Sequence, residues 1–210
     1  MIKEKLKRGS IFYKIYLHFS IFIRYKWFQR NRKSFSQFGE DIFINSFFKN
    51  QKIGKYVDLG AFHPMRLNNT YLLYKKGWSG TNIDLNQISI DMFNIARKND
   101  KNICSLVSDK NDQKKKAYFE HEWSAVNSIE LNEDLSKNLK YEKLMETKTF
   151  DKMIDEPFDF LNIDLEGHDY EVLKTIDLNK YSIKLICIEI LESCTKKDKI
   201  YNYMKNSNFK

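Results

Sequence analysis

Acidic side chains close four of the short apolar runs in this sequence. Each run has the length and composition of a buried β-strand, and an ordinary core strand has no reason to end in a carboxylate. A carboxylate in such a position can accept hydrogen bonds from ligand hydroxyls or take a proton from one of them. The four acids are Asp58, Asp84, Asp109 and Asp164.

The runs that carry these acids alternate with helical patterns along the chain. Strands are expected at 56–60, 79–84, 103–107, 158–165 and 184–190. Helices are expected at 70–76, 88–98, 169–176 and 196–206. Such alternation predicts right-handed crossovers and a mainly parallel sheet, which places the fold in the α/β class. Ligands of parallel sheets bind outside the carboxyl ends of the strands, where we expect the four acids to meet.

Two other segments have a simple local interpretation. Ser36 has the side chain of a helix N-cap, and acids follow it in the expected first turn, where they complement the helix dipole. The lysine run at 114–116 is expected to lie in a solvated loop.

The glycine pattern narrows the class of ligand. Gly60 follows the first strand without a second glycine nearby, whereas a dinucleotide or triphosphate loop needs several glycines so that backbone amides can surround the phosphates. Gly60 allows one close approach of a ligand to the backbone, and Asp84 can accept hydrogen bonds from both hydroxyls of a ribose. A nucleoside that carries no phosphate points, on this fold, to S-adenosylmethionine.

Several stretches of the chain closely resemble the FkbM-type S-adenosylmethionine-dependent methyltransferases. They are SQFGEDIF (36–43), VDLGAFHP (57–64), NNTYLLYKKGWSGTNID (68–84), LNIDLEGHDYEVLK (161–174) and ICIEI (186–190). The resemblance covers about residues 36–190, in order and at sensible spacing. It implies a Rossmann-like methyltransferase fold, with S-adenosylmethionine as the cofactor and a sugar or polyketide hydroxyl as the methyl acceptor.

The resemblance also implies roles for the residues at the cofactor. Asp58 and Gly60 match the residues of the cofactor loop, and Asp84 matches the acid that binds the ribose. Asp109 stands where the family has a polar residue beside the adenine, and the neighbouring Ser108 is assigned to the same cofactor-binding set.

Three residues after the fourth strand are the candidates for catalysis. A sugar hydroxyl is a poor nucleophile, so its methylation benefits from a base or from a metal that lowers the hydroxyl pKa. Asp164, Glu166 and His168 are close enough in sequence to supply one. One of the acids is interpreted as the base or as a substrate contact, whereas a shared divalent cation and a purely structural role are the alternatives; no residue is assigned to a metal. Glu189, at the end of the fifth strand, is a further candidate to line the acceptor cleft.

The charge of the chain is concentrated at its beginning. The formal net charge is +8, but residues 1–33 alone carry ten basic side chains and one acid, a net +9, which leaves −1 for the remainder. The basic character therefore gives no support to nucleic-acid binding by the globular part, and the expected partner is a small-molecule or glycan acceptor.

Residues 1–34 are expected to form a basic, aromatic, helical leader, followed by a methyltransferase domain at 35–210. The most apolar part of the leader, residues 11–23, is too short to span a bilayer and precedes no small-residue cleavage site. Two interpretations stay open. Residues 1–33 could bind a membrane surface as an interfacial anchor, or the helix could pack on the domain or on another subunit of a homo-oligomer.

The end of the sequence departs from the family pattern. Methyltransferases of this fold usually finish with an antiparallel hairpin, which we expect to be missing here because the chain stops soon after residues 196–206. An exposed sheet edge could pair with another chain. The alternative function is therefore a non-catalytic module that keeps the fold and binds a membrane surface or a partner. The three cysteines, Cys104, Cys187 and Cys194, fit no disulfide framework, so a cytoplasmic location is expected.

Overall fold

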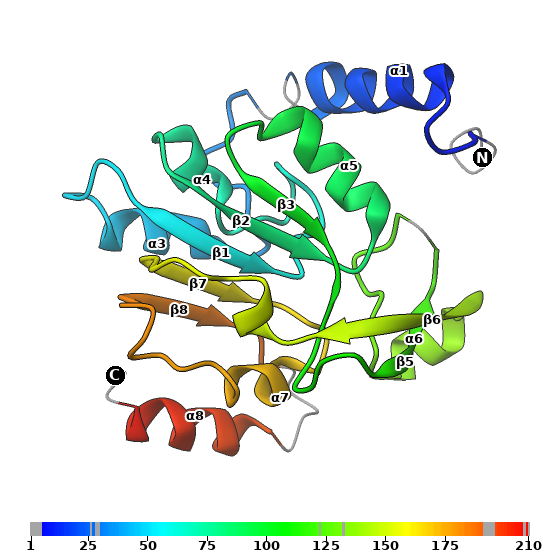
Figure 1. The fold of residues 1–210 in the computed structure, drawn as a ribbon. Helices are drawn as coiled ribbons and strands as arrows, with labels where there is room; N and C mark the ends of the chain where they lie inside the picture. Colours follow the sequence, from blue (N-terminus) through cyan, green and yellow to red (C-terminus); the bar gives the residue numbers. More distant parts are fainter. Residues whose placement is uncertain are drawn as a thin grey trace.

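The structure is a computed structural model that describes residues 6–25, 27, 30–121, 123–131, 133–190, 196–207 and 209. In this part of the chain, five parallel strands form the central sheet, in the order β3-β2-β1-β7-β8 (Figure 1). Their bounds are β1 (Lys55–Leu59), β2 (Ser79–Asp84), β3 (Lys101–Cys104), β7 (Phe160–Ile163) and β8 (Leu185–Ile188). The order reverses between β1 and β7, and a parallel sheet binds ligands at such a switch point.

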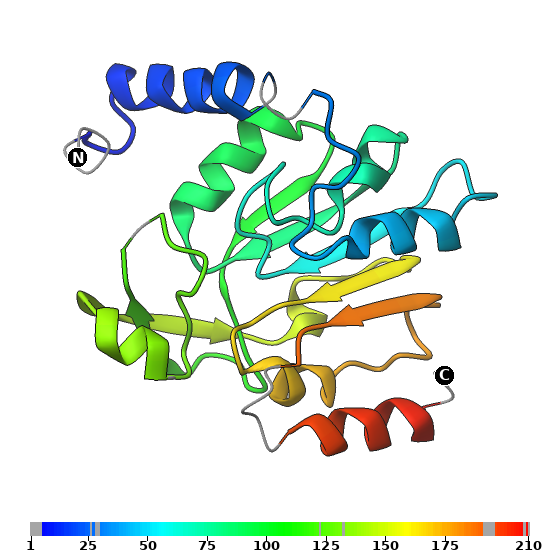
Figure 2. The same cartoon turned by 180° about the vertical axis from the view of Figure 1, so that it is seen from behind.

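Helices cover both faces of the sheet (Figures 1 and 2). Apolar residues at odd positions of β1, such as Val57 and Leu59, share a core with side chains of α7 and α8. Tyr56, whose side chain points to the opposite face, packs with residues of α3 and α4. The helix bounds are α1 (Ile11–Phe19), α3 (Glu40–Phe47), α4 (Tyr71–Lys75), α5 (Gln87–Ala96), α6 (Glu133–Asn138), α7 (Asp169–Leu173) and α8 (Lys197–Asn206).

A smaller sheet corrects two of the expectations from the sequence. It has the order β4-β6-β5, with bounds β4 (Leu106–Val107), β5 (Lys114–Phe119) and β6 (Tyr141–Lys148). The strand expected at 103–107 is thus divided between two sheets at Ser105. The lysines expected in a loop form the first half of β5, where they pair with residues of β6. A largely solvated edge strand tolerates such a run, and Lys116 also forms a 2.7 Å ion pair with Glu142.

The start of α3 differs from the expected one. The helix begins at Glu40 with Gly39 as its N-cap, in a left-handed conformation (φ 96°). Ser36 lies three residues earlier, where its hydroxyl accepts a hydrogen bond from the Gly39 N–H (3.0 Å) and donates one to Asp41 (2.9 Å). The expected cap side chain therefore supports the turn before the helix instead of capping its first residue.

The leader forms α1 and a π-helix (Ser20–Tyr25), and both lie along the outside of α5 (Figures 1 and 2). Ser10 caps α1 by accepting a hydrogen bond from the Tyr13 N–H. Tyr13, Leu17 and Ile21 are buried in a cluster with Met65, Ile88 and Met92. One of the two interpretations, in which the leader packs on the domain, thus holds for one face of α1. Among the described residues, no helix combines the length and apolar character that a membrane crossing requires.

Candidate active site

Two cavities meet at the carboxyl ends of the central strands. The Asp84 cavity is lined by Gly60, Asp84, Ser105, Leu106, Asp164 and Glu166, among others. The Glu189 cavity is lined by Phe38, Gly60, Asn69, Asp164, Glu166 and Glu189, among others. Gly60, Asp164 and Glu166 belong to both linings. The two cavities therefore share a wall at the switch point of the sheet.

Gly60 occupies its position because no side chain fits there. Its φ is 76°, in the left-handed region, and a Cβ on its Cα would lie 1.7 Å from the carbonyl oxygen of Asp164. Its N–H donates to the Ile83 carbonyl (2.9 Å), which holds the turn after β1 against β2. Only glycine satisfies both the conformation and the close approach of β1 to the residue after β7.

Asp84, the last residue of β2, lies in the Asp84 cavity as a buried acid. One carboxylate oxygen accepts from the Phe62 N–H (2.8 Å) and the other from the Asn86 N–H (2.6 Å). Burial raises the pKa of Asp84 to about 6, although these two hydrogen bonds favour the ionised form. The Ser89 side chain gives a further hydrogen bond, and the remaining acceptor capacity of the carboxylate is available to a ligand hydroxyl.

Asp58 points away from both cavities, into the core. It is buried, and its carboxylate accepts from Asn162 (2.8 Å), Thr70 (3.0 Å) and Asn68 (3.2 Å). Burial raises its pKa. The predicted cofactor role of Asp58 stays a prediction, and these contacts favour an indirect form of it, in which Asp58 fixes the loop that follows Gly60.

Arg97, just after α5, completes the support of that loop. The side chain is fully buried, and its guanidinium donates to the Pro64 carbonyl (2.7 Å), Asn68 (2.6 Å) and Thr70 (2.7 Å). Asn68 and Thr70 are thus held by Asp58 from one side and by Arg97 from the other. Sequence reasoning missed Arg97, because a basic residue at the end of a helix usually interacts with the helix dipole in solvent.

The two predicted cofactor residues after β4 form a separate polar cluster. The Ser108 hydroxyl lies 3.0 Å from Asp109, and Lys115 donates to both of them. Hydrogen bonds from Lys115 and Ser108 lower the pKa of Asp109. Neither residue lines the Asp84 cavity; Ser105, Leu106 and Val107 do. The break between β3 and β4 places the contacts three residues earlier than the continuous strand predicted.

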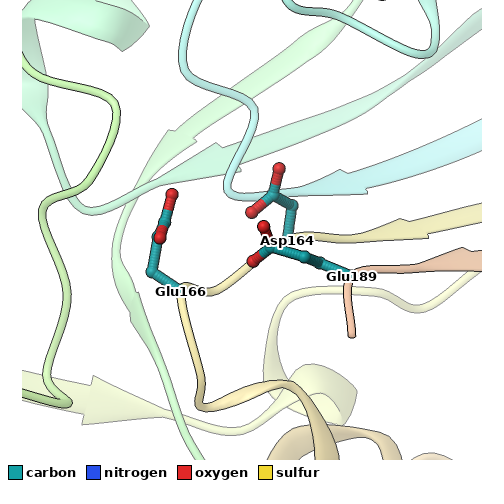
Figure 3. Close-up of side chains that lie close together, drawn as sticks. All are labelled: Asp164, Glu166 and Glu189. Atoms are coloured by element: carbon teal, nitrogen blue, oxygen red, sulfur yellow. The ribbon is translucent and has the colours of Figure 1, made fainter. Parts of the chain in front are cut away.

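Three acids converge on the shared wall, and their side chains are drawn in Figure 3. Asp164 and Glu166 follow β7, and Glu189 follows β8, from which it extends toward Asp164. One carboxylate oxygen from each lies within 4.8 Å of the others. The sequence placed Asp164 and Glu166 on one side of a strand, but β7 ends at Ile163. Glu166 instead adopts a left-handed conformation (φ 52°), a strained geometry that is typical of functional sites.

Burial and mutual repulsion raise the pKa values of these acids. Burial is the main cause for Asp164, followed by the nearby charges of Glu189 and Glu166, and its pKa is raised well above the usual value. Burial and the charge of Glu189 raise the pKa of Glu166 to about 7. Burial also raises the pKa of Glu189, although a hydrogen bond with Asp164 opposes the shift. The pKa values of all three acids are thus raised, and that of Glu166 lies near neutral pH.

The same three acids could instead hold a divalent cation, because carboxylate oxygens are the ligands that hard cations prefer. Their spacing permits one oxygen from each to reach a common ion. The geometry alone is thus compatible with a metal-free cluster of acids and with a bound cation, and chelation separates the two experimentally.

His168 contributes to the Asp84 cavity from a fixed position. Its Nε2 lies 3.2 Å from the Ser108 hydroxyl and its Nδ1 lies 3.0 Å from Glu130. Both ring nitrogens are engaged, and the side chain is buried. The predicted catalytic role of His168 stays a prediction, and these contacts favour one in which the histidine positions the start of α7.

A parallel sheet of this strand order, with two adjoining cavities at the carboxyl ends of its strands, is the arrangement of a Rossmann-like methyltransferase fold. Comparison with protein families agrees, since the methyltransferase FkbM domain matches residues 46–210. The chain belongs to the FkbM methyltransferase family. No significant match was found among the curated proteins or among the solved structures.

Proposed function

We propose that this chain is an S-adenosylmethionine-dependent O-methyltransferase that acts on a hydroxyl of a glycan or a related metabolite. The donor binds in the Asp84 cavity and the acceptor in the Glu189 cavity. The observation that carries this proposal is the wall that the cavities share at Gly60, Asp164 and Glu166. A methyl group on one side of that wall and a hydroxyl on the other have the proximity that an in-line displacement needs.

The lining of the Asp84 cavity supports the donor. Asp84 keeps acceptor capacity for a ribose hydroxyl, and Gly60 lines the same cavity. The leaving sulfur loses its positive charge in the transition state, so strong negative charge directly beside it would stabilise the ground state. The raised pKa of Asp164 suits this requirement, because it disfavours a negative charge at the shared wall.

We assign the role of general base to Glu166. Its carboxylate faces both cavities, and its pKa of about 7 leaves a large ionised fraction at neutral pH while keeping the group basic enough to accept a proton. The acceptor hydroxyl gives its proton to Glu166 as its oxygen bonds to the methyl carbon and the carbon–sulfur bond breaks. Glu189 has a buried oxygen, Oε2, without a hydrogen-bond partner among the described residues, and this oxygen orients the acceptor.

The other residues of the Glu189 cavity support a hydroxyl-rich acceptor. Asn69 and Asn162 line it and are joined by a 2.9 Å hydrogen bond, which leaves further donor and acceptor sites for ligand hydroxyls. Phe38 and Phe62 also line this cavity and supply apolar surface. Polar groups combined with apolar walls are the usual lining of a site that orients a small ligand.

Calorimetry with S-adenosylhomocysteine tests the donor site of the full chain, and mass spectrometry tests methyl transfer to a panel of free glycans. Donor binding with transfer to a hydroxyl is the expected result. Absence of donor binding would instead support the non-catalytic module. Binding with transfer only to non-hydroxyl acceptors would contradict the assigned acceptor class. Turnover that survives EDTA supports the base, whereas turnover lost in EDTA and restored by Mg²⁺ would assign the three acids to a cation.

A further inference from the structure

The leader helix has two apolar faces, and only one of them is covered by the domain. The inner face is formed by Tyr13 and Leu17, which are buried against the α5 side of the domain. The outer face consists of apolar residues exposed to solvent: Ile11, Phe12, Ile15, Phe19 and Ile23. Phe12 is 70% exposed and Ile15 58% exposed, although side chains of this kind usually gain by burial.

The two faces lie on opposite sides of the helix. Successive residues of an α-helix are rotated by about 100°, so Phe12, Ile15 and Phe19 gather on a single side. Tyr13 and Leu17 fall on the other side. An ordinary surface helix is polar where it faces solvent, so an apolar outer face indicates a further contact.

Basic side chains are frequent in the segment that carries this outer face. Exposed cations occur before α1, within it and after the π-helix: Lys7, Lys14, Arg30, Arg32 and Lys33. The segment 1–33 has one acid, Glu4, against ten basic residues. Arg8 is held by Asp91 of α5 through a 2.8 Å ion pair, which also helps to fix the helix on the domain. The apolar outer face thus belongs to a segment with an excess of positive charge.

We propose that this outer face binds the surface of an anionic phospholipid bilayer, with α1 parallel to the membrane plane. Apolar side chains would enter the boundary between headgroups and acyl chains, and the cations would meet the lipid phosphates. In Figures 1 and 2, α1 lies at the edge of the molecule beyond α5, so a flat surface can reach it without meeting the rest of the domain. This inference is independent of the proposed methyl transfer.

Charge favours a bilayer over a second copy of the chain as the occupant. Two copies that met through their outer faces would bring together two segments of net charge +9. Such an arrangement is repulsive, whereas an anionic lipid surface attracts the same segment by about 1 kcal/mol for each basic residue near it.

Co-sedimentation of the full chain with vesicles tests the proposal. We expect binding to vesicles of phosphatidylcholine with phosphatidylserine, and much weaker binding to phosphatidylcholine alone. The double variant Phe12→Gln/Phe19→Gln should bind the anionic vesicles at least about tenfold less tightly, since it removes two large apolar contacts. The matched control Phe43→Gln/Ile53→Gln changes residues that are 67% and 78% exposed but lie outside the leader, and it should bind as the unchanged chain does.

Several results would overturn the proposal. These are no binding to anionic vesicles, equal binding to neutral ones, or equal loss in the control variant. A dimer that dissociates in the Phe12→Gln/Phe19→Gln variant, measured by analytical ultracentrifugation without lipid, would assign the face to a second copy instead. Circular dichroism and thermal unfolding confirm that each variant is folded, so that weak binding can be ascribed to the lost surface.

Discussion

The carbonyl oxygen of Asp164 occupies the space where a side chain on Gly60 would begin. The distance from an ideal Cβ on Gly60 to this oxygen is 1.7 Å, far inside van der Waals contact. The turn after β1 and the residue after β7 are therefore packed backbone against backbone. This approach brings Asp164 to the shared wall, where the two cavities meet.

Replacing Gly60 by alanine should therefore disturb both the fold and the site. We expect Gly60→Ala to lower the free energy of unfolding by about 4 kcal/mol or more, because the backbone has to move apart. Gly39→Ala is the matched control, since Gly39 also has a positive φ but a Cβ there meets nothing within 4 Å. Gly39→Ala should lower the free energy of unfolding only by the cost of holding an alanine in the left-handed conformation, about 1–2 kcal/mol. Urea unfolding of both variants makes the comparison, and equal losses would contradict the close approach.

Variants of Asp84 and Asp109 test which of these two acids contacts the donor. Asp84→Asn should weaken the binding of S-adenosylhomocysteine about tenfold or more, because it removes charge-assisted hydrogen bonds to the ribose. Asp109→Asn should leave the affinity unchanged, because Asp109 pairs with Lys115 outside the Asp84 cavity. Calorimetry measures both. A large loss in the Asp109 variant would restore the direct adenine-side contact that the sequence predicted.

The pH dependence of turnover should report the ionisation of Glu166. A base must be ionised to act, so kcat should rise with pH and level off above an apparent pKa of about 7. Glu166→Gln should lower kcat about a hundredfold or more. Glu171→Gln is the control, since a hydrogen bond from Lys174 lowers the pKa of this partly exposed acid. A flat profile between pH 5 and 8, or full activity of Glu166→Gln, would remove the assignment.

The same carboxyl group should make the fold less stable as the pH rises. Between the usual Glu pKa of 4.5 and the folded value of about 7, the folded chain holds a proton that the unfolded chain has lost. The contribution of Glu166 to stability is therefore fully present below pH 4.5 and is lost as the pH rises through 7. Relative to the unchanged chain, Glu166→Gln should gain on the order of 3 kcal/mol at pH 8 compared with pH 4. Urea unfolding at both pH values tests whether Glu166→Gln stabilises the fold more at pH 8 than at pH 4. Glu171→Gln should not show this difference.

Arg97 should be a major determinant of stability, although it lies outside both cavities. Arg97→Met leaves Asp58 buried near no cation and breaks the hydrogen bonds to Pro64, Asn68 and Thr70. Loss of one partner from such a network costs about 3–5 kcal/mol in the free energy of unfolding. The exposed Arg66 serves as control, because Arg66→Met should change stability by less than about 0.5 kcal/mol. Thermal unfolding distinguishes them, and similar melting temperatures would show that the network contributes little.

Local patterns in the sequence were sufficient for the central sheet. Strands such as β2, expected and found at 79–84, could be located by their place in the alternation of strands and helices. Of the four acids expected to meet at this edge of the sheet, Asp84 and Asp164 line the two cavities, whereas Asp58 and Asp109 do not. The FkbM family, stated first as a resemblance, is confirmed by the match over residues 46–210.

Contacts between distant residues set the limits of that approach. The sequence around Asp58 is the same whether its side chain faces a ligand or the core. Its partner Asn162 lies more than a hundred positions away. The lysines of β5 become a strand because β6 pairs with them, which their own composition does not favour. The break at Ser105 between β3 and β4 moves the cavity lining in a similar way. In each case, a partner far along the chain decides the outcome.

Asp58 and Arg97 both form hydrogen bonds with Asn68 and Thr70. Because of this support, the linings of the two cavities differ in how easily they can be substituted. The turn beside the Asp84 cavity is anchored in the core, so a variant that enlarges it also loosens the domain. The Glu189 cavity takes much of its lining from side chains at its mouth, such as Phe38, which is 85% exposed and can be exchanged at little cost to folding. In the proposed function, acceptor preference can therefore diverge within this scaffold while binding of the nucleoside stays constant.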